Sequence, residues 1–193
     1  MIDAILSNRG ASVKTRITVK TLISAVVIAL AVALPQLLHV ASGAAGGVKW
    51  LPMYLPVIVG ACVLGVKWGA VTALLSPIVS FLLTSALSSP MPAAARLPFM
   101  ASELVVMAII AGSSSSLVNK NAAFGMLAVF SALVLGRAFF MLSVVIFQSV
   151  TPFTPAVIWG QIVTGIPGLI VNFVAASALI ALFSLLIKGE RDR

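Results

Sequence analysis

The chain is poor in the residues from which most soluble catalytic and metal sites are built. Its 193 residues include one cysteine, one histidine, one tyrosine and four carboxylates, and charged residues make up 8% of the total. The single cysteine, Cys62, excludes a disulfide framework and a cysteine-based zinc site. No Gly-x-x-x-x-Gly-Lys-Ser/Thr loop is present, which excludes the usual route of nucleotide hydrolysis. From these absences we expect no catalytic residues, no bound metal and no cofactor.

Apolar sequence is what the chain has in abundance. Hydrophobic residues make up 61% of it and the mean hydropathy is +1.21, values that exclude a soluble domain and a disordered chain. Six apolar runs cover roughly 21–40, 53–66, 69–87, 98–118, 122–148 and 158–187. Their length and their lack of period-two alternation predict membrane-crossing helices and not a barrel. We therefore expect an all-α membrane protein with a bundle of six transmembrane helices.

The basic residues alternate between the ends of these runs, and this alternation predicts the sidedness of the chain. If the N-terminus is cytoplasmic, nine of the twelve basic residues lie inside: Arg9, Lys14, Arg16, Lys20, Lys67, Lys120, Lys188, Arg191 and Arg193. Lys49 and Arg96 then lie outside, and Arg137 remains within the fifth run. Because Lys and Arg in short loops set orientation, this pattern predicts an N-in, C-in protein. The net charge of +8 is thus a topology signal, and we expect no nucleic-acid partner.

The same topology divides the chain into three parts and orders its loops. Residues 1–20 form a cytoplasmic lead, 21–187 the transmembrane domain and 188–193 a cytoplasmic tail. The three longer connections then all face outward, and we expect the glycine-rich first one, from His39 to Leu51, to be a loop. Long outer loops favour a solute site near the outer surface.

Glu103 and Arg137 are the only ionisable residues well inside predicted spans. Charges there are costly, so such residues are normally paired or functional and face the bundle interior. The helical rise places Glu103 about 9 Å and Arg137 about 16 Å from the outer ends of their helices, a difference that an arginine side chain can bridge. Three interpretations stay open: a buried ion pair, contact with a polar solute, and a proton relay.

Several other polar and aromatic residues are predicted near the outer ends of the helices. Trp50 and Tyr54 are explained either by an interfacial aromatic belt or by a lid over a solute. Asn172 is placed deeper, about 20 Å into the last helix, where helix–helix hydrogen bonding is its expected role. The candidate substrate-binding residues are His39, Lys49, Trp50, Tyr54, Arg96, Glu103, Arg137, Gln148, Trp159 and Gln161.

Two further patterns concern helix surfaces and helix ends. Ala25, Ala29 and Ala33 share one face of the first helix, and small residues there allow another helix to approach closely. Ser113 to Ser116 invite comparison with an intramembrane serine protease, but His39 is predicted at the other side of the membrane, out of reach of a serine nucleophile. A capped helix end accounts for these serines better.

These features together resemble the substrate-binding S component of energy-coupling factor (ECF) vitamin importers. The similarity covers about 20–187 and is strongest over 51–104. It is carried by Ala25, Ala29 and Ala33, by the stretches Leu51–Val57, Leu64–Ala70, Leu74–Pro77, Phe81–Thr84 and Leu97–Leu104, and by Gly60, Gly136 and Arg137. Similar sequences often have Met-His-x-Pro where this chain has Met53-Tyr54-Leu55-Pro56. The Gly-x-Pro-Pro that commonly follows the third helix is replaced by 86–92.

The resemblance implies a protein of the bacterial or archaeal cytoplasmic membrane that captures a vitamin or related micronutrient outside. It places the solute beneath the first, third and fifth loops and against the last three helices. It also implies that Ala25, Ala29 and Ala33 contact a transmembrane coupling subunit, which two cytoplasmic ATPases drive. Two other functions stay open: a stand-alone proton-coupled transporter or channel that uses Glu103, and an intramembrane hydrolase that uses Ser114.

Overall fold

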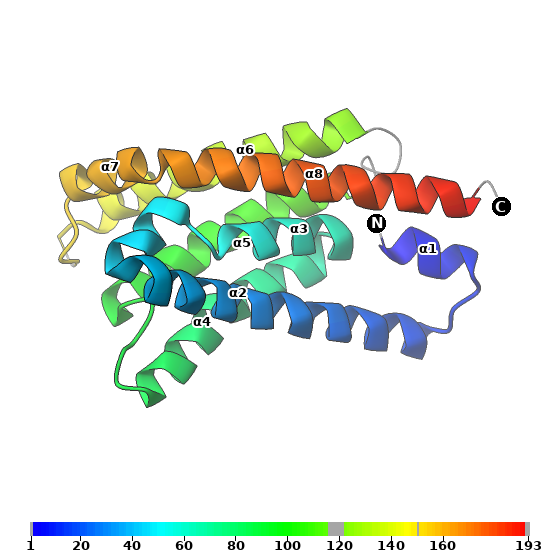
Figure 1. Cartoon of the computed structure of the whole chain (residues 1–193), viewed down its shortest axis with the longest axis horizontal. Helices are drawn as coiled ribbons and strands as arrows, with labels where there is room; N and C mark the ends of the chain where they lie inside the picture. The colour runs from blue at the N-terminus through cyan, green and yellow to red at the C-terminus, as the bar shows by residue number, and fades with distance from the viewer. Residues whose placement is uncertain (1, 116–121, 150, 192–193) are drawn as a thin grey trace.

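The computed structural model describes residues 2–115, 122–149 and 151–191, and within these ranges every regular element is a helix. In chain order they are α1 (Ile2–Asn8), α2 (Val13–Trp50), α3 (Tyr54–Leu64), α4 (Val66–Ala86), the 3-10 turn η1 (Ala94–Arg96), α5 (Leu97–Ser113), α6 (Ala122–Phe147), α7 (Pro155–Thr164) and α8 (Ile166–Arg191) (Figure 1). Ser116, Lys120 and Arg193 lie outside the described residues. The predicted all-α class is confirmed.

Six segments are long and apolar enough to cross a membrane. They are Val13–Gly43, Gly46–Leu64, Val66–Ala86, Ala94–Ser113, Ala123–Phe147 and Ile166–Leu185. Large apolar side chains such as Leu82, Phe130 and Leu185 are exposed, whereas Ser76 and Thr84 are buried. Apolar groups outside and polar groups inside are expected of helices in lipid. The prediction of six helices long and apolar enough to cross a membrane is confirmed, and they fit a multi-pass membrane protein.

The helices run back and forth between two ends of an elongated bundle (Figure 1). One end, which we call the terminal end, carries α1 and the last turns of α8. The other, which we call the loop end, carries the α2–α3, α4–α5 and α6–α7 connections together. The three longer connections that the sequence placed on one side are thus gathered at one end of the molecule.

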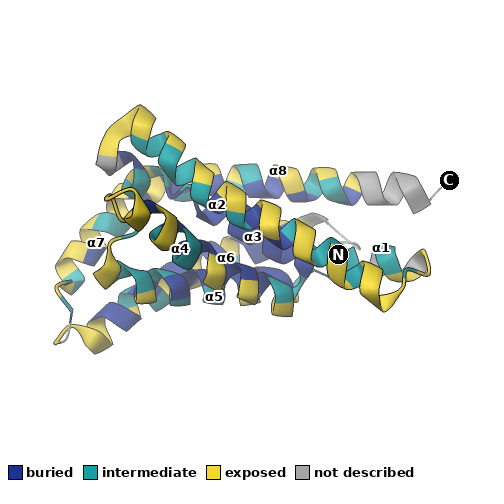
Figure 2. Cartoon of the chain, turned by 90° about the horizontal axis from the view of Figure 1, so that it is seen from below, coloured by how far each residue is buried: buried dark blue, intermediate teal, exposed yellow. Residues whose placement is uncertain are grey.

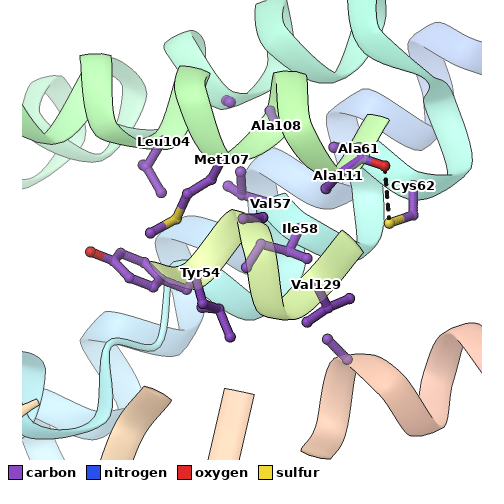
Figure 3. Close-up of a cluster of buried hydrophobic side chains, with 14 of the residues drawn as sticks. Tyr54, Val57, Ile58, Ala61, Cys62, Leu104, Met107, Ala108, Ala111 and Val129 are labelled. Carbon is purple, nitrogen blue, oxygen red and sulfur yellow. Dashed lines mark hydrogen bonds between the residues drawn. The ribbon is translucent and has the colours of Figure 1, made fainter. Parts of the chain in front are cut away.

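The short helix α3 forms the centre of the bundle (Figure 2). Its Val57, Ile58 and Ala61 pack into one core with residues of α5, including Leu104 and Met107 (Figure 3). With 11 residues α3 is too short to span alone, but the second span begins earlier, at Gly46, so that the end of α2 completes it. The second span is therefore longer than the apolar run at 53–66 from which it was predicted.

The expected loop between His39 and Leu51 is wrong, because this segment is helical. The alanine-rich sequence favours helix, and the chain changes direction at Gly43, whose φ of 66° and ψ of −171° interrupt α2. Glycine adopts such a positive φ at little cost. α2 then continues to Trp50 and ends at Leu51, which takes a left-handed conformation and donates its N–H to the Gly47 carbonyl at 3.2 Å.

The last apolar run, predicted as one helix over 158–187, is two helices. α7 ends at Gly165, whose N–H donates to the Gln161 carbonyl at 2.9 Å. Pro167 follows two residues later and has no N–H with which to continue that helix. Asn172 therefore lies only six residues beyond the start of α8, nearer the loop end than predicted.

At the terminal end, α1 is tied to α2 by one carboxylate. Arg16 Nη2 donates to Asp3 Oδ1 at 3.0 Å, and Lys20 Nζ donates to Asp3 Oδ2 at 2.6 Å. Partial burial acts to raise the pKa of Asp3, but the hydrogen bonds from Lys20 and Arg16 outweigh it and hold the pKa below the usual 3.8.

We expect Asp3→Asn to loosen α1 from α2. Surface pairs of this kind contribute about 0.2–1 kcal/mol each, so the loss of both should speed up amide hydrogen exchange in α1 by about 2- to 30-fold at neutral pH. Because folding lowers the pKa of Asp3, its contribution is present above pH 3.8 and is lost as the pH falls further. Acidified wild type should approach the variant in exchange, corrected for intrinsic rates. Equal exchange of α1 in both proteins at neutral pH would exclude this role for Asp3.

Candidate functional site

A cavity of about 290 Å³ lies at the loop end. This volume is near the lower limit of the roughly 300–1,000 Å³ typical of small-molecule sites. Its walls come from α2, α3, α4, α5, α6 and α7, and from the α4–α5 connection. The lining residues are Pro35, Gly47, Val48, Leu51, Pro52, Met53, Tyr54, Ser80, Pro90, Met91, Pro92, Ala93, Arg96, Met100, Glu103, Arg137, Phe140 and Gln161.

An ion pair between α5 and α6 forms one wall of this cavity. Arg137 Nη1 lies 3.4 Å from Glu103 Oε1, and the two residues are only 7% and 2% exposed. The Tyr54 hydroxyl donates a hydrogen bond to the same carboxylate oxygen, and the Arg137 guanidinium lies 4.9 Å from the centre of the Tyr54 ring. The sequence-based interpretation of Glu103 and Arg137 as a buried pair is confirmed, and both also line the cavity.

Close packing of α5 on α6 brings the pair together. Gly136 precedes Arg137, and a Cβ at Gly136 would lie 2.4 Å from Met107 Cγ, so the absence of a side chain lets the helices approach. Tyr54 begins α3, and its ring lies at the edge of the core with the hydroxyl pointing away from the apolar cluster (Figure 3). The hydroxyl is thereby available to Glu103.

Arg96 supplies a second cation to the cavity. The sequence placed it as a loop charge, but the turn η1 carries it against the cavity, where its guanidinium lies 6.0 Å from the centre of the Phe140 ring. Its side chain is half-buried. Among the described residues no carboxylate is within 4.0 Å of Arg96, whereas Glu103 is shared by Arg137 and Tyr54. Arg96 is therefore a cation with an aromatic contact and, among the described residues, no ion pair of its own.

Two residues that line the cavity each have one buried side-chain atom without a hydrogen-bond partner. These atoms are Arg137 Nε, a donor, and Gln161 Oε1, an acceptor. Buried polar groups are nearly always hydrogen-bonded, because leaving one unpaired costs about 1–3 kcal/mol. Their position marks where a polar molecule in the cavity would find partners.

The α4–α5 connection is fixed to α4 by hydrogen bonds at Met91. Ser80 Oγ donates to the Met91 carbonyl at 2.8 Å, and the Met91 N–H donates to Thr84 Oγ1 at 2.7 Å. Ser80 and Thr84 lie one helical turn apart on the buried face of α4. Met91 and the following Pro92 thus cover one side of the cavity.

The α2–α3 junction is fixed from the opposite side by α8. Asn172 Nδ2 donates to the Trp50 carbonyl at 3.0 Å, so the expected interhelical hydrogen bond of Asn172 is confirmed. The backbones themselves nearly touch, because a Cβ at Gly168 would lie 2.4 Å from the Lys49 carbonyl oxygen. This contact positions Val48 and Leu51, which line the cavity.

The structure brings five of the ten predicted site residues to the cavity: Tyr54, Arg96, Glu103, Arg137 and Gln161. The other five do not line it: His39, Lys49, Trp50, Gln148 and Trp159. Gln148 and Trp159 are exposed, and the exposed Lys49 stacks on the Trp50 ring at 5.3 Å. Since the expected first loop is helical, the α2 residues His39, Lys49 and Trp50 follow the helix surface and do not fold over the cavity.

Sequence reasoning missed the apolar walls of the cavity, chiefly Met53, Met100 and Phe140. Such residues are common throughout transmembrane helices, so no local signal separates these three from their neighbours. Away from the cavity, Cys62 is buried and its thiol lies 3.6 Å from the Ala111 carbonyl (Figure 3). The described residues contain no cluster of three or more potential metal ligands.

Comparisons of the chain with known protein families, with curated proteins and with solved structures found no match.

Proposed function

We propose that this chain is the solute-specificity subunit, or S component, of an ECF-type ATP-driven importer. It would capture a vitamin or related micronutrient and deliver it inward with a coupling subunit and two ATPases. The observation that carries the proposal is the cavity at the loop end, which combines a buried Tyr54–Glu103–Arg137 cluster with apolar walls. A few convergent polar groups in an otherwise apolar cavity are typical of small-molecule sites.

The surface of α2 supports a partner within the membrane. Ala25, Ala29 and Ala33 are all exposed and lie on one face. The core contacts of this helix are made by other residues, such as Val27 and Ala31. Exposed small residues at four-residue spacing suit close packing with another transmembrane helix, as the resemblance to S components implies.

The distribution of charge supports an orientation with the loop end outside. Arg9, Lys14, Arg16 and Lys20 lie at the terminal end together with α1, and Lys67 follows the turn at Gly65. By the positive-inside rule this end faces the cytoplasm. The cavity then faces the side from which a nutrient arrives, and the ATPases act at the terminal end of a bacterial or archaeal cytoplasmic membrane.

The test is co-purification with the coupling subunit and ATPases, with solute binding measured in parallel. Ala29→Leu should reduce recovery of the partners at least tenfold without weakening solute binding, because it adds bulk only to the exposed face of α2. Ala138→Leu is a matched control, since Ala138 is an exposed alanine of α6. Equal recovery with both variants would exclude this docking face.

A second experiment separates the importer from its rivals. In vesicles containing the purified chain alone, we expect no solute uptake in response to a proton gradient. Uptake under these conditions would favour the stand-alone transporter and overturn the proposal. Product formed from a lipid or peptide and abolished by Ser114→Ala would instead favour a hydrolase.

A further inference from the structure

The cavity also indicates what class of solute it takes. We infer that it binds a small molecule with one carboxylate, which pairs with Arg96, and with a hydroxyl or N–H group that donates to Gln161. The inference deepens the proposed function and rests on it, because both use the same cavity. The charges, the unpaired polar atoms and the apolar walls of the cavity each support it.

The charges of the cavity are unbalanced. Two arginines and one glutamate line it, so it carries one excess positive charge. Glu103 already accepts the Tyr54 hydroxyl and pairs with Arg137. The excess charge therefore resides on Arg96, whose only described contact of this kind is with the face of Phe140.

An anionic solute corrects this imbalance, and other solutes do not. A cation that is partly withdrawn from water gains most from a charged partner, and a guanidinium binds a carboxylate through two parallel N–H donors. A neutral solute would leave Arg96 without a counter-ion. A cationic solute would add a second uncompensated charge to an apolar cavity, which is costly.

The two unpartnered buried atoms specify further contacts. Arg137, which lines the same cavity as Arg96, has a buried Nε N–H that no group accepts. A carboxylate or carbonyl oxygen of the solute satisfies it. Gln161 also lines the cavity, and its Oε1 is an acceptor without a donor, which a hydroxyl or N–H group of the solute would supply. The solute therefore needs hydrogen-bond acceptors near Arg96 and Arg137 and a donor near Gln161 of α7.

The walls and the volume limit the rest of the solute. Met53, Met100 and Phe140 present sulfur, methylene and aromatic surface to the cavity, together with Met91 and Pro92 of the α4–α5 connection. With about 290 Å³ available, the body between carboxylate and donor must be compact and largely apolar or flat. A large, highly charged or polymeric solute does not fit.

The test begins with purified full-length protein in detergent and the small-molecule fraction of an aqueous cell extract. Native mass spectrometry identifies each compound that the protein retains, and its uncharged methyl amide is then prepared. We expect the retained compound to carry a carboxylate, and its methyl amide to bind roughly 10- to 100-fold more weakly, as expected when a charge-assisted hydrogen bond is lost.

Three variants assign the carboxylate to its partner. Arg96→Gln should weaken binding of the acid roughly 10- to 100-fold, yet leave the affinity for the amide nearly unchanged. Arg96→Lys should recover part of the affinity, because it keeps the charge and loses the two-pronged geometry. Lys49→Gln removes the same charge at the loop end but outside the cavity, and should change neither affinity. The acid and amide comparison on wild type stands even if an Arg96 variant fails to fold.

The outcomes separate the two proposals. Retention of only neutral or cationic compounds, or an acid that binds Arg96→Gln as well as wild type, overturns the carboxylate assignment and leaves solute capture intact. Retention of no compound from the extract overturns both the assignment and the proposed function.

Discussion

Glu103→Ala is expected to destabilise the folded protein by about 3–5 kcal/mol. The replacement leaves Arg137, which is 7% exposed, without its counter-ion, and leaves the Tyr54 hydroxyl without its acceptor. A buried charge that loses its partner keeps the full cost of its desolvation, whereas the intact pair offsets much of that cost. Thermal unfolding in detergent measures the effect, and an unchanged unfolding temperature would contradict the role assigned to the pair.

A double replacement separates stability from binding. In Glu103→Leu with Arg137→Met the whole pair becomes apolar, and such exchanges are often neutral or stabilising. We expect the double variant to unfold close to wild type but to lose retention of the solute, because Glu103 and Arg137 both line the cavity. Retention equal to wild type would show that Glu103 and Arg137 only pack the helices. Instability equal to that of Glu103→Ala would show that Tyr54 and the cavity depend on the pair itself.

Gly168→Ala is expected to destabilise the protein by about 3 kcal/mol, the upper end for overpacked sites. The new Cβ would lie 2.4 Å from the Lys49 carbonyl oxygen and 2.7 Å from the Trp50 carbonyl carbon. Both are backbone atoms at the end of α2, so relief requires α8 to move away from the α2–α3 junction. That movement stretches the hydrogen bond from Asn172 to the Trp50 carbonyl and displaces Leu51 from the cavity wall.

Matched controls for Gly168→Ala come from two other helical glycines. A methyl group added at Gly160 in α7 would meet no atom within 4 Å, so Gly160→Ala should be neutral or stabilising by up to about 1 kcal/mol. Gly136→Ala would meet only the flexible side chain of Met107 and should cost less than Gly168→Ala. If all three variants have the same unfolding temperature, close backbone contact is not what holds α8 against α2.

The site was partly predictable because buried charge is rare in lipid. Glu103 and Arg137 stand out in any apolar run, and the helical rise alone puts them within reach of each other. The alternation of basic residues placed Arg96 in an outer loop. Nothing in its flanking residues shows that η1 turns its side chain toward Phe140. Gln161 was predicted as a site residue at the start of one long helix, and the structure places it in the cavity on the separate helix α7.

The sequence by itself determined that the chain is helical, how many spans it has and which charges are too deep to stay unpaired. Those properties follow from local composition, because a backbone in lipid must satisfy its hydrogen bonds within each segment. The tertiary structure decided that α2 is interrupted at Gly43 and then resumes as helix to Trp50, that α8 meets α2 backbone to backbone at Gly168, and that Arg96 enters the cavity. These features depend on how segments far apart in the chain pack together. A glycine at a close contact, or a short turn of helix, then determines which neighbours a side chain contacts.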